Sequence, residues 1–213
     1  HNLDAVDPPF EYKVVTPDFR FNPLGYNIEK SMKQILQDFE TGRSYGHIVE
    51  KFSEYPIIID SNANVLSFPP IINGEVTRVS TETKNLFIDI TSTNMKSAED
   101  VLAVLLTALA DMGGKLESIE VQYPTYKKIT PDLAISKMII ESSFINRLLG
   151  MNLSQSEIIK NLNRSRLDAK ISNDSIDVSV PRYRSDIIHP IDIVEEVLLG
   201  YNVAKLTPTI PES

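Results

Sequence analysis

The sequence predicts an α+β protein: a mixed-sheet domain with flanking helices, followed by a small winged-helix-like α+β domain. Three observations support this fold class. Short β-branched and apolar runs follow one another between residues 55 and 91, as in a strand meander. A capped helix is predicted from Ala98 to Met112, closed by Gly113-Gly114. In the last third, two helical segments precede a hairpin, which is the outline of a winged helix.

In the first part a strand-like run, Phe10–Val15, precedes a helix, and further strands follow it. From Asn27 to Phe39 the apolar residues recur at helical spacing. Strands are expected at Tyr55–Asp60 and Val65–Phe68, and the Asn73-Gly74 pair is a strong signal for a tight hairpin. Another strand is expected from Asn85 to Thr91.

A domain boundary is expected near residue 125. The segment Pro124–Pro131 is a loop of Pro, Thr and Lys that follows a completed α+β pattern. We therefore divide the chain into an editing-type domain at 1–125 and a winged-helix-like domain at 126–213, which includes the start of a C-terminal linker.

The second part is predicted to run helix, helix, strand, strand, helix. Apolar residues at helical spacing cover Ala134–Leu148, and Ser154-Gln-Ser-Glu157 forms a capping box that opens the next helix. Asn173-Asp174 is the expected hairpin turn. The last helix begins at Pro190, in the position that Pro prefers, and Gly200 is expected to end it.

Charge and composition exclude several classes of function. The formal net charge is −8, and the acidic excess lies in residues 1–123, with 10 Lys/Arg against 18 Asp/Glu. An acidic surface repels phosphate, so this part is not expected to hold nucleic acid through a broad basic face. The chain has no Cys, which excludes disulfides and thiolate chemistry. No apolar run reaches the roughly 18 residues of a membrane helix, and no signal peptide is visible, so we expect a cytoplasmic protein.

Four acidic residues lie at or before the last predicted helix. Asp192, Glu195 and Glu196 share one helix face at i, i+3 and i+4, and Asp186 stands just before the helix. Carboxylates on one face repel each other, and the helix N-terminus or a hard cation such as Mg²⁺ would offset that charge. The alternative is an acidic first turn with a solvated Glu-Glu pair.

Four polar residues lie within the apolar strand region: Ser67, Asn73, Asp89 and Thr91. If Asp89 and Thr91 are two apart on one strand, both point to the same face, where a carboxylate and a hydroxyl can hold a phenol, an ammonium or a water. In the alternative interpretation these residues only make turns and strand ends. The three His residues, His1, His47 and His189, are scattered along the chain, and we expect surface or structural roles for them.

Two long patterns resemble one known family. Residues Pro181–Tyr201 contain Pro-x-Tyr-Arg-x-Asp-Ile, then Asp-x-x-Glu-Glu-Val, then Gly-Tyr. This stretch, together with Tyr55–Asp60, Leu66–Gly74 and Leu86–Thr93, resembles the beta subunit of phenylalanyl-tRNA synthetase of the archaeal and eukaryotic type. The resemblance implies a fragment that carries the editing module and the following winged-helix-like module. It also implies that Asp186, Asp192, Glu195 and Glu196 hold a Mg²⁺ shared with the alpha subunit.

The editing module of that family hydrolyses tyrosine wrongly esterified to tRNA(Phe). A pocket shaped for Phe rejects an added hydroxyl by only about a hundredfold, so a second site has to recognise the phenol. By resemblance, Asp89 and Thr91 are the catalytic residues, and Ser67 and Asn73 bind the substrate. One departure from the family pattern is Ser92, where Gly is expected.

The resemblance also implies the partners and the division of labour. These are the alpha subunit, within a heterotetramer, and tRNA(Phe); no membrane or DNA partner is expected. Aminoacylation and its ATP site are expected to belong to the whole phenylalanine–tRNA ligase, and this part is expected to contribute ester hydrolysis. The rival hypotheses are a non-catalytic scaffold that docks tRNA and the alpha subunit, and an unrelated winged-helix regulator.

Overall fold

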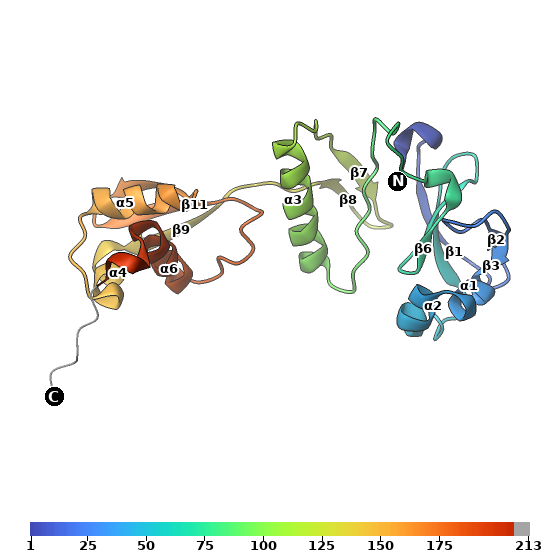
Figure 1. The fold of residues 1–213 in the computed structure, drawn as a ribbon, viewed down its shortest axis with the longest axis horizontal. Helices are drawn as coiled ribbons and strands as arrows, with labels where there is room; N and C mark the ends of the chain where they lie inside the picture. Colours follow the sequence, from blue (N-terminus) through green and yellow to red (C-terminus); the bar gives the residue numbers. More distant parts are fainter. Residues whose placement is uncertain (207–213) are drawn as a thin grey trace. The chain divides into compact units, whose positions relative to one another are not determined.

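The computed structural model describes residues 1–206, and the chain divides into two compact units, His1–Thr93 and Asn94–Ser213 (Figure 1). Each unit combines sheets with helices, which confirms the predicted α+β class. Every strand pair within residues 1–206 is antiparallel, whereas a mixed sheet was expected. The reason is that most paired strands follow each other through short connections that reverse the chain. The expected start of a C-terminal linker extends into 207–213, outside the described residues.

The first unit is built on a four-stranded sheet of order β1-β4-β5-β6, with a separate two-stranded ladder β2-β3. Its elements are β1 (Glu11–Val15), β2 (Arg20–Phe21), β3 (Lys30–Ser31), α1 (Met32–Asp38), α2 (Glu40–Tyr45), β4 (Tyr55–Ile59), β5 (Val65–Phe68), β6 (Ile72–Asn73) and the 3-10 turns Leu3–Ala5, Gly46–Ile48 and Glu75–Thr77.

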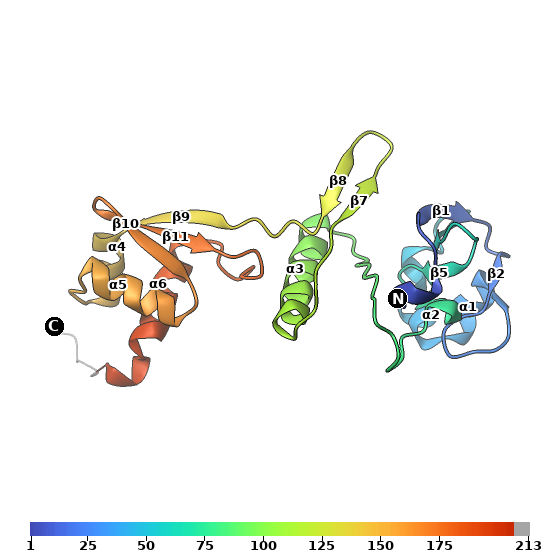
Figure 2. The same ribbon diagram turned by 90° about the horizontal axis from the view of Figure 1, so that it is seen from above.

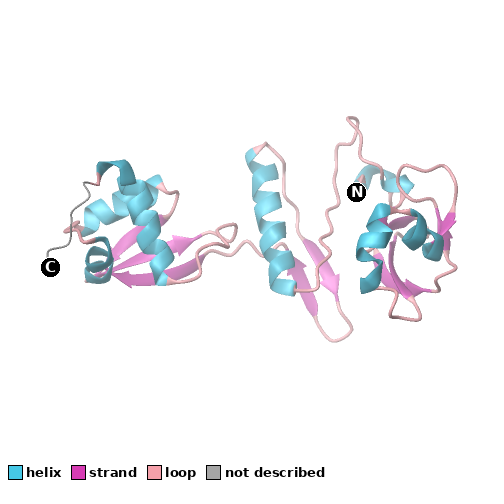
Figure 3. Ribbon diagram, turned by 60° about the horizontal axis from the view of Figure 1, so that its bottom comes forward, coloured by secondary structure: helices cyan, strands magenta, loops and turns pink. Residues whose placement is uncertain are grey.

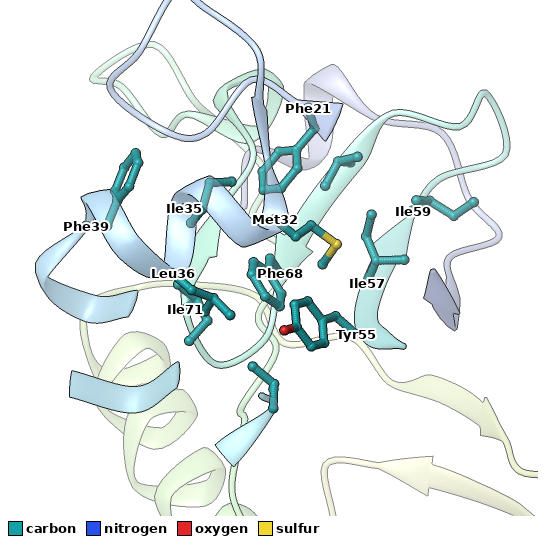
Figure 4. Close-up of a cluster of buried hydrophobic side chains, with 12 residues drawn as sticks. Phe21, Met32, Ile35, Leu36, Phe39, Tyr55, Ile57, Ile59, Phe68 and Ile71 are labelled. Carbon is teal, nitrogen blue, oxygen red and sulfur yellow. The ribbon is translucent and has the colours of Figure 1, made fainter. Parts of the chain in front are cut away.

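The core of the first unit lies between α1 and one face of the sheet. Met32 and Ile35 of α1 are fully buried and contribute to one cluster with Ile57 and Phe68 of the strands (Figure 4). Helix α1 begins later than the predicted Asn27, because Ser31 caps it and residues 30–31 pair as strand β3. The buried residues of α1 are Met32, Ile35 and Leu36, and these pack against the sheet.

The β5–β6 hairpin does not turn where the sequence predicted. The chain reverses at Pro69-Pro70, and Asn73 lies within β6, directly opposite Ser67. Gly74 has φ −77°, whereas a tight turn at Asn73-Gly74 needs positive φ. Gly74 is required for another reason, since a Cβ there would lie 1.9 Å from the carbonyl oxygen of Val65.

The second unit begins with a helix and a hairpin and ends with a winged-helix-like part. The helix and hairpin are α3 (Met95–Asp111), β7 (Ile119–Gln122) and β8 (Lys127–Thr130) (Figure 2). The winged-helix-like part contains β9 (Ser136–Glu141), α4 (Ser142–Leu149), α5 (Gln155–Arg164), β10 (Asp168–Ser172), β11 (Ser175–Val180), α6 (Pro190–Tyr201) and the 3-10 turn Val203–Lys205. Its three helices cover one face of a sheet of order β10-β11-β9 (Figure 3).

The division after Thr93 differs from the boundary predicted near residue 125. Ion pairs within the second unit connect α3 to β8 and to the loop before α6. Glu99 on α3 contacts Lys128 of β8, and Arg182, in that loop, contacts both Glu99 and Asp100. In this division the Pro-rich loop connects elements of one unit.

The helix predicted over Ala134–Leu148 is wrong in its first half. Residues Ser136–Glu141 form strand β9, and Ile140 pairs with Ile176 of β11. A short apolar run fits either a strand or a helix, and pairing with β11 decides it. Other predictions in this part are confirmed: the capping box of Ser154, the hairpin turn at Asn173 and the start of α6 at Pro190.

Helices α5 and α6 cross at Gly200. This residue lies inside α6 and does not end it as predicted. A Cβ at Gly200 would lie 2.0 Å from the backbone oxygen of Asn161. The close approach lets Ile193 and Val197 of α6 join the buried cluster that includes Ile158.

Among residues 1–206, no helix is both long and apolar enough to cross a membrane.

A buried carboxylate holds the turn between β4 and β5. Asp60 is 2% exposed and accepts hydrogen bonds from the backbone N–H groups of Asp7, Asn62 and Asn64 and from the Asn64 side chain. Burial acts to raise the pKa of Asp60, but these hydrogen bonds outweigh it and lower the pKa below its usual range.

We predict that Asp60→Asn lowers the free energy of unfolding by about 1–3 kcal/mol, because an amide N–H would face donors that now have a carboxylate. A depressed folded-state pKa stabilises the fold above the unfolded pKa of about 3.9 and loses that contribution as the pH falls through the folded value. Urea unfolding between pH 7 and pH 2 should show a weaker acid dependence in the variant. Asp18→Asn, at an exposed position, is the control, and equal curves for both variants would contradict the prediction.

We predict that Gly200→Ala lowers the stability of the second unit by about 1–3 kcal/mol, because the added methyl group overlaps backbone of α5. Amide hydrogen exchange in α5 and α6 is the measurement. Gly46→Ala is the matched control, since its nearest contact would be an ordinary 3.4 Å to the Glu50 side chain. Unchanged exchange in α5 and α6 would show that the crossing tolerates a Cβ.

Candidate functional site

One face of the four-stranded sheet carries a row of paired residues. Tyr12 is opposite Ile58, Ile58 is opposite Ser67, and Ser67 is opposite Asn73. Residues directly opposed in antiparallel strands lie side by side on the same face. The predicted substrate-binding residues, Ser67 and Asn73, are therefore neighbours, and Ser67 is buried at 4% exposure. The interpretation of Asn73 as a mere hairpin-turn residue is wrong.

A cavity of about 710 Å³ lies beside this row. Its walls are mostly apolar and aromatic, and they share Tyr12 with the row. The lining residues are Tyr12, Val14, Tyr45, Ile48, Val49, Phe52, Ser53, Glu54, Pro56, Pro69, Pro70, Thr91, Ser92 and Thr93. This volume is in the range of small-molecule sites and is large enough for an aromatic amino acid.

Of the four residues predicted for this site, Thr91 lines the cavity and Ser67, Asn73 and Asp89 do not. The strand expected from Asn85 to Thr91 is reduced to a single bridge between Leu86 and Asn2. We expected strand alternation to place Asp89 and Thr91 on one face. Because this segment is not a strand, that argument does not apply. Ser92, where the family pattern led us to expect Gly, is also a cavity-wall residue.

Asp89 ends a chain of hydrogen bonds through a histidine. Nε2 of His1 lies 2.6 Å from Oδ1 of Asp89, and Nδ1 of His1 lies 2.9 Å from Oγ1 of Thr77. The Thr77 hydroxyl donates to the carbonyl oxygen of Gly74 at 2.9 Å. This chain connects Asp89 to the end of β6, next to Asn73. Burial raises the pKa of the Asp89 carboxyl.

Backbone hydrogen bonds and ring packing hold His1 in place. The N–H of Phe87 donates to the carbonyl oxygen of His1, and the N–H of Asn2 donates to that of Thr77. The Phe87 ring stacks on the His1 imidazole, with centroids 5.9 Å apart. The His1 side chain is 1% exposed.

His1 and Thr77 are the residues that sequence reasoning missed. His47 and His189 are exposed, as expected for surface residues, but His1 is not. The available signal was Asp89 itself, since a carboxylate between apolar residues that becomes partly buried requires a donor.

Two of the four predicted metal ligands, Asp186 and Glu196, are held by an arginine. Arg184 donates to both oxygens of Asp186, at 2.9 Å and 2.7 Å, and to Glu196 at 2.6 Å. It also donates to the carbonyl oxygen of Ser165 at the end of α5. The hydrogen bonds from Arg184 lower the pKa of Asp186, and in turn the pKa of Arg184 is raised.

The other two acids do not join that cluster. Oδ2 of Asp192 accepts the backbone N–H groups of His189 and Ile188 at the start of α6, which lowers the pKa of Asp192. Glu195 is exposed. No three His, Cys, Asp or Glu side chains in residues 1–206 converge as metal ligands. In this arrangement the predicted Mg²⁺ ligand set does not fit a metal, because a guanidinium already stands between two of its members.

Comparison with known proteins gives the same family for both units. Residues 138–202 match the family described as the tRNA synthetase B5 domain. The whole chain is 41% identical to the phenylalanine–tRNA ligase beta subunit of Methanococcoides burtonii, covering 40% of that protein. It is 41% identical to the beta subunit of Archaeoglobus fulgidus, with 99% of the chain and 38% of the relative covered.

A solved structure is similar as well. It is the crystal structure of an N-terminal fragment of the phenylalanyl-tRNA synthetase beta subunit from Pyrococcus horikoshii, 40% identical, with a TM-score of 0.91 over 94% of this chain and 58% of that one. The chain spans about two fifths of the length of the curated relatives it matches. It is therefore related over its whole length to the phenylalanine–tRNA ligase beta subunits and corresponds to a part of such a subunit that includes the B5 domain.

Proposed function

We propose that this chain proofreads aminoacyl-tRNA: it hydrolyses tyrosine wrongly esterified to tRNA(Phe), as part of a phenylalanine–tRNA ligase beta subunit. The observation that carries the proposal is the aromatic-lined cavity with Thr91 in its wall, beside the sheet face that holds Ser67 and Asn73. A scaffold that only docks partners requires no such cavity.

Selection for tyrosine requires groups that Phe would leave unpaired. An apolar pocket distinguishes an added hydroxyl weakly, whereas a site that hydrogen-bonds the phenol penalises Phe by leaving polar groups unsatisfied. We assign this role to Ser67 and Asn73, which are polar neighbours on an otherwise apolar face.

We assign the hydrolytic step to a water held by Asp89 and Thr91. The water oxygen bonds to the ester carbonyl carbon, and the bond from that carbon to the ribose oxygen breaks. The proton that leaves the water passes through Asp89 to the ribose oxygen, giving free tyrosine and tRNA. The raised pKa of Asp89 suits a group that takes up and returns a proton.

The partners follow from the same proposal. The beta subunit assembles with the alpha subunit into the complete ligase, which binds tRNA(Phe) in the cytoplasm. Phenylalanine activation with ATP belongs to that assembly. The acidic charge of residues 1–123 implies that basic surfaces elsewhere in the ligase supply most of the affinity for tRNA.

We predict that Asp89→Ala, in the assembled ligase, slows deacylation of Tyr-tRNA(Phe) by about a hundredfold or more, because it removes the proton acceptor. The measurement is the single-turnover release of tyrosine from mischarged tRNA. Phenylalanine charging should be unchanged, and Glu82→Gln, at an exposed position, is the control. Deacylation at the parental rate would remove Asp89 from the mechanism.

We predict that Arg184→Gln lowers the free energy of unfolding of the second unit by about 1–3 kcal/mol, because Glu196 loses its charged donor. The parental chain should melt at the same temperature with Mg²⁺ or with a chelator, since Arg184 already neutralises these acids. Lys160→Gln, an exposed charge change on α5, is the control. A saturable rise of the parental melting temperature with Mg²⁺, reversed by the chelator, would support the metal site instead.

A further inference from the structure

We propose that His1 is the positioning residue for Asp89, which it holds through a shared proton so that the other carboxylate oxygen is left for the hydrolytic water. The inference rests on the proposed function, because it assigns a partner to the proposed catalytic carboxylate. It begins from the imidazole, whose two nitrogens both lie within hydrogen-bond distance of protein oxygens although the side chain is 1% exposed. A ring engaged at both nitrogens has one orientation.

The hydrogen-bond chain fixes the protonation of the ring. The Thr77 hydroxyl uses its only proton on the carbonyl oxygen of Gly74, so Oγ1 of Thr77 has to accept from Nδ1–H of His1. Nε2 then faces Oδ1 of Asp89 at 2.6 Å. A lone pair facing a carboxylate would repel it, so one proton lies between these two atoms.

The shared proton determines what Asp89 can do. Either an imidazolium faces a carboxylate, or a neutral ring faces a neutral acid, and in both cases the buried side of the pair holds one proton. Oδ1 is engaged by His1, which leaves Oδ2 to accept a hydrogen bond from a water. The carboxylate is thereby fixed in orientation, which lowers the cost of placing the water against the ester.

Thr77 connects the His1 ring to the backbone at the end of β6. It is 2% exposed, and its hydroxyl lies between the ring and the backbone at the β6 end. The backbone N–H of Asn2 donates to the carbonyl oxygen of Thr77, so residues 1–2 and 77 are joined twice. The ring position therefore depends on the same hairpin that carries Ser67 and Asn73.

Paired variants distinguish positioning from a structural role. In the assembled ligase, His1→Gln can place an amide donor near the Nε2 position, and His1→Asn can reach only toward the Nδ1 position. We expect His1→Asn to lower the kcat of Tyr-tRNA(Phe) deacylation by about a hundredfold with KM unchanged, and His1→Gln to restore at least a tenth of the parental rate. Thr77→Val should also lower kcat, and Thr77→Ser should restore it.

A double-mutant cycle separates the failure of this inference from failure of the proposed function. If His1 acts through Asp89, the Asp89→Ala and His1→Asn double variant is no slower than Asp89→Ala alone. If the parental ligase does not deacylate Tyr-tRNA(Phe), the proposed function fails. If Asp89→Ala retains the parental rate, Asp89 leaves the mechanism and this inference fails with it. If Asp89→Ala is slow while His1→Asn and Thr77→Val keep the parental kcat, the positioning role of His1 is overturned and the proposed function stands.

A measurement without substrate checks the shared proton directly. Nitrogen-15 NMR of the imidazole should give a protonated Nδ1, and the Nε2 signal should shift when Asp89 is changed to Asn. This readout also covers the case in which the His1 variants fail to fold, because Asp89→Asn leaves the ring and Thr77 in place. An Nδ1 signal typical of an unprotonated nitrogen would overturn the derivation.

Discussion

A carboxylate placed among apolar side chains needs a hydrogen-bond donor, and the bond from His1 to Asp89 meets that need. An isolated charge in such a place is costly, and the usual solutions are a partner or a shifted pKa; Asp89 has both. Because His1 is anchored on Thr77, the same bond connects the segment after residue 85 to the β5–β6 hairpin. The candidate site depends on that connection, since otherwise Asp89 and the Ser67–Asn73 pair belong to separate segments.

In the second unit the carboxylates of Asp186 and Glu196 are paired with the guanidinium of Arg184. Asp186 and Glu196 come from the loop before α6 and from α6 itself, and Arg184 reaches both as well as the end of α5. Acidic residues at matching spacing suggested a metal, and the structure places a guanidinium between two of them. The arginine guanidinium has five N–H donors in a fixed geometry, so it can hold two carboxylates at once. The arrangement joins the loop before α6 to the α5–α6 pair.

Local signals predicted local structure well. The capping box at Ser154, the turn at Asn173 and the Pro190 helix start are each determined by residues within a few positions of one another. The failures share a different cause. Strand β9 was predicted as a helix because its partner β11 lies about 35 residues further on. The Asn73-Gly74 pair predicted a hairpin turn, but the chain reverses at Pro69-Pro70. Long-range pairing outweighs local propensity wherever both conformations are accessible.

The sequence by itself determined the α+β class, the caps and turns of the winged-helix-like part, and the residue types at the candidate site, because these follow from periodicity and short-range chemistry. Only the tertiary structure decided which of those residues meet. It placed Ser67 opposite Asn73, put Thr91 but not Asp89 among the residues that line a cavity, and gave Asp89 a histidine 88 positions away. The physical reason is that hydrogen bonds and burial join atoms that are close in space, and spacing along a chain does not determine that distance.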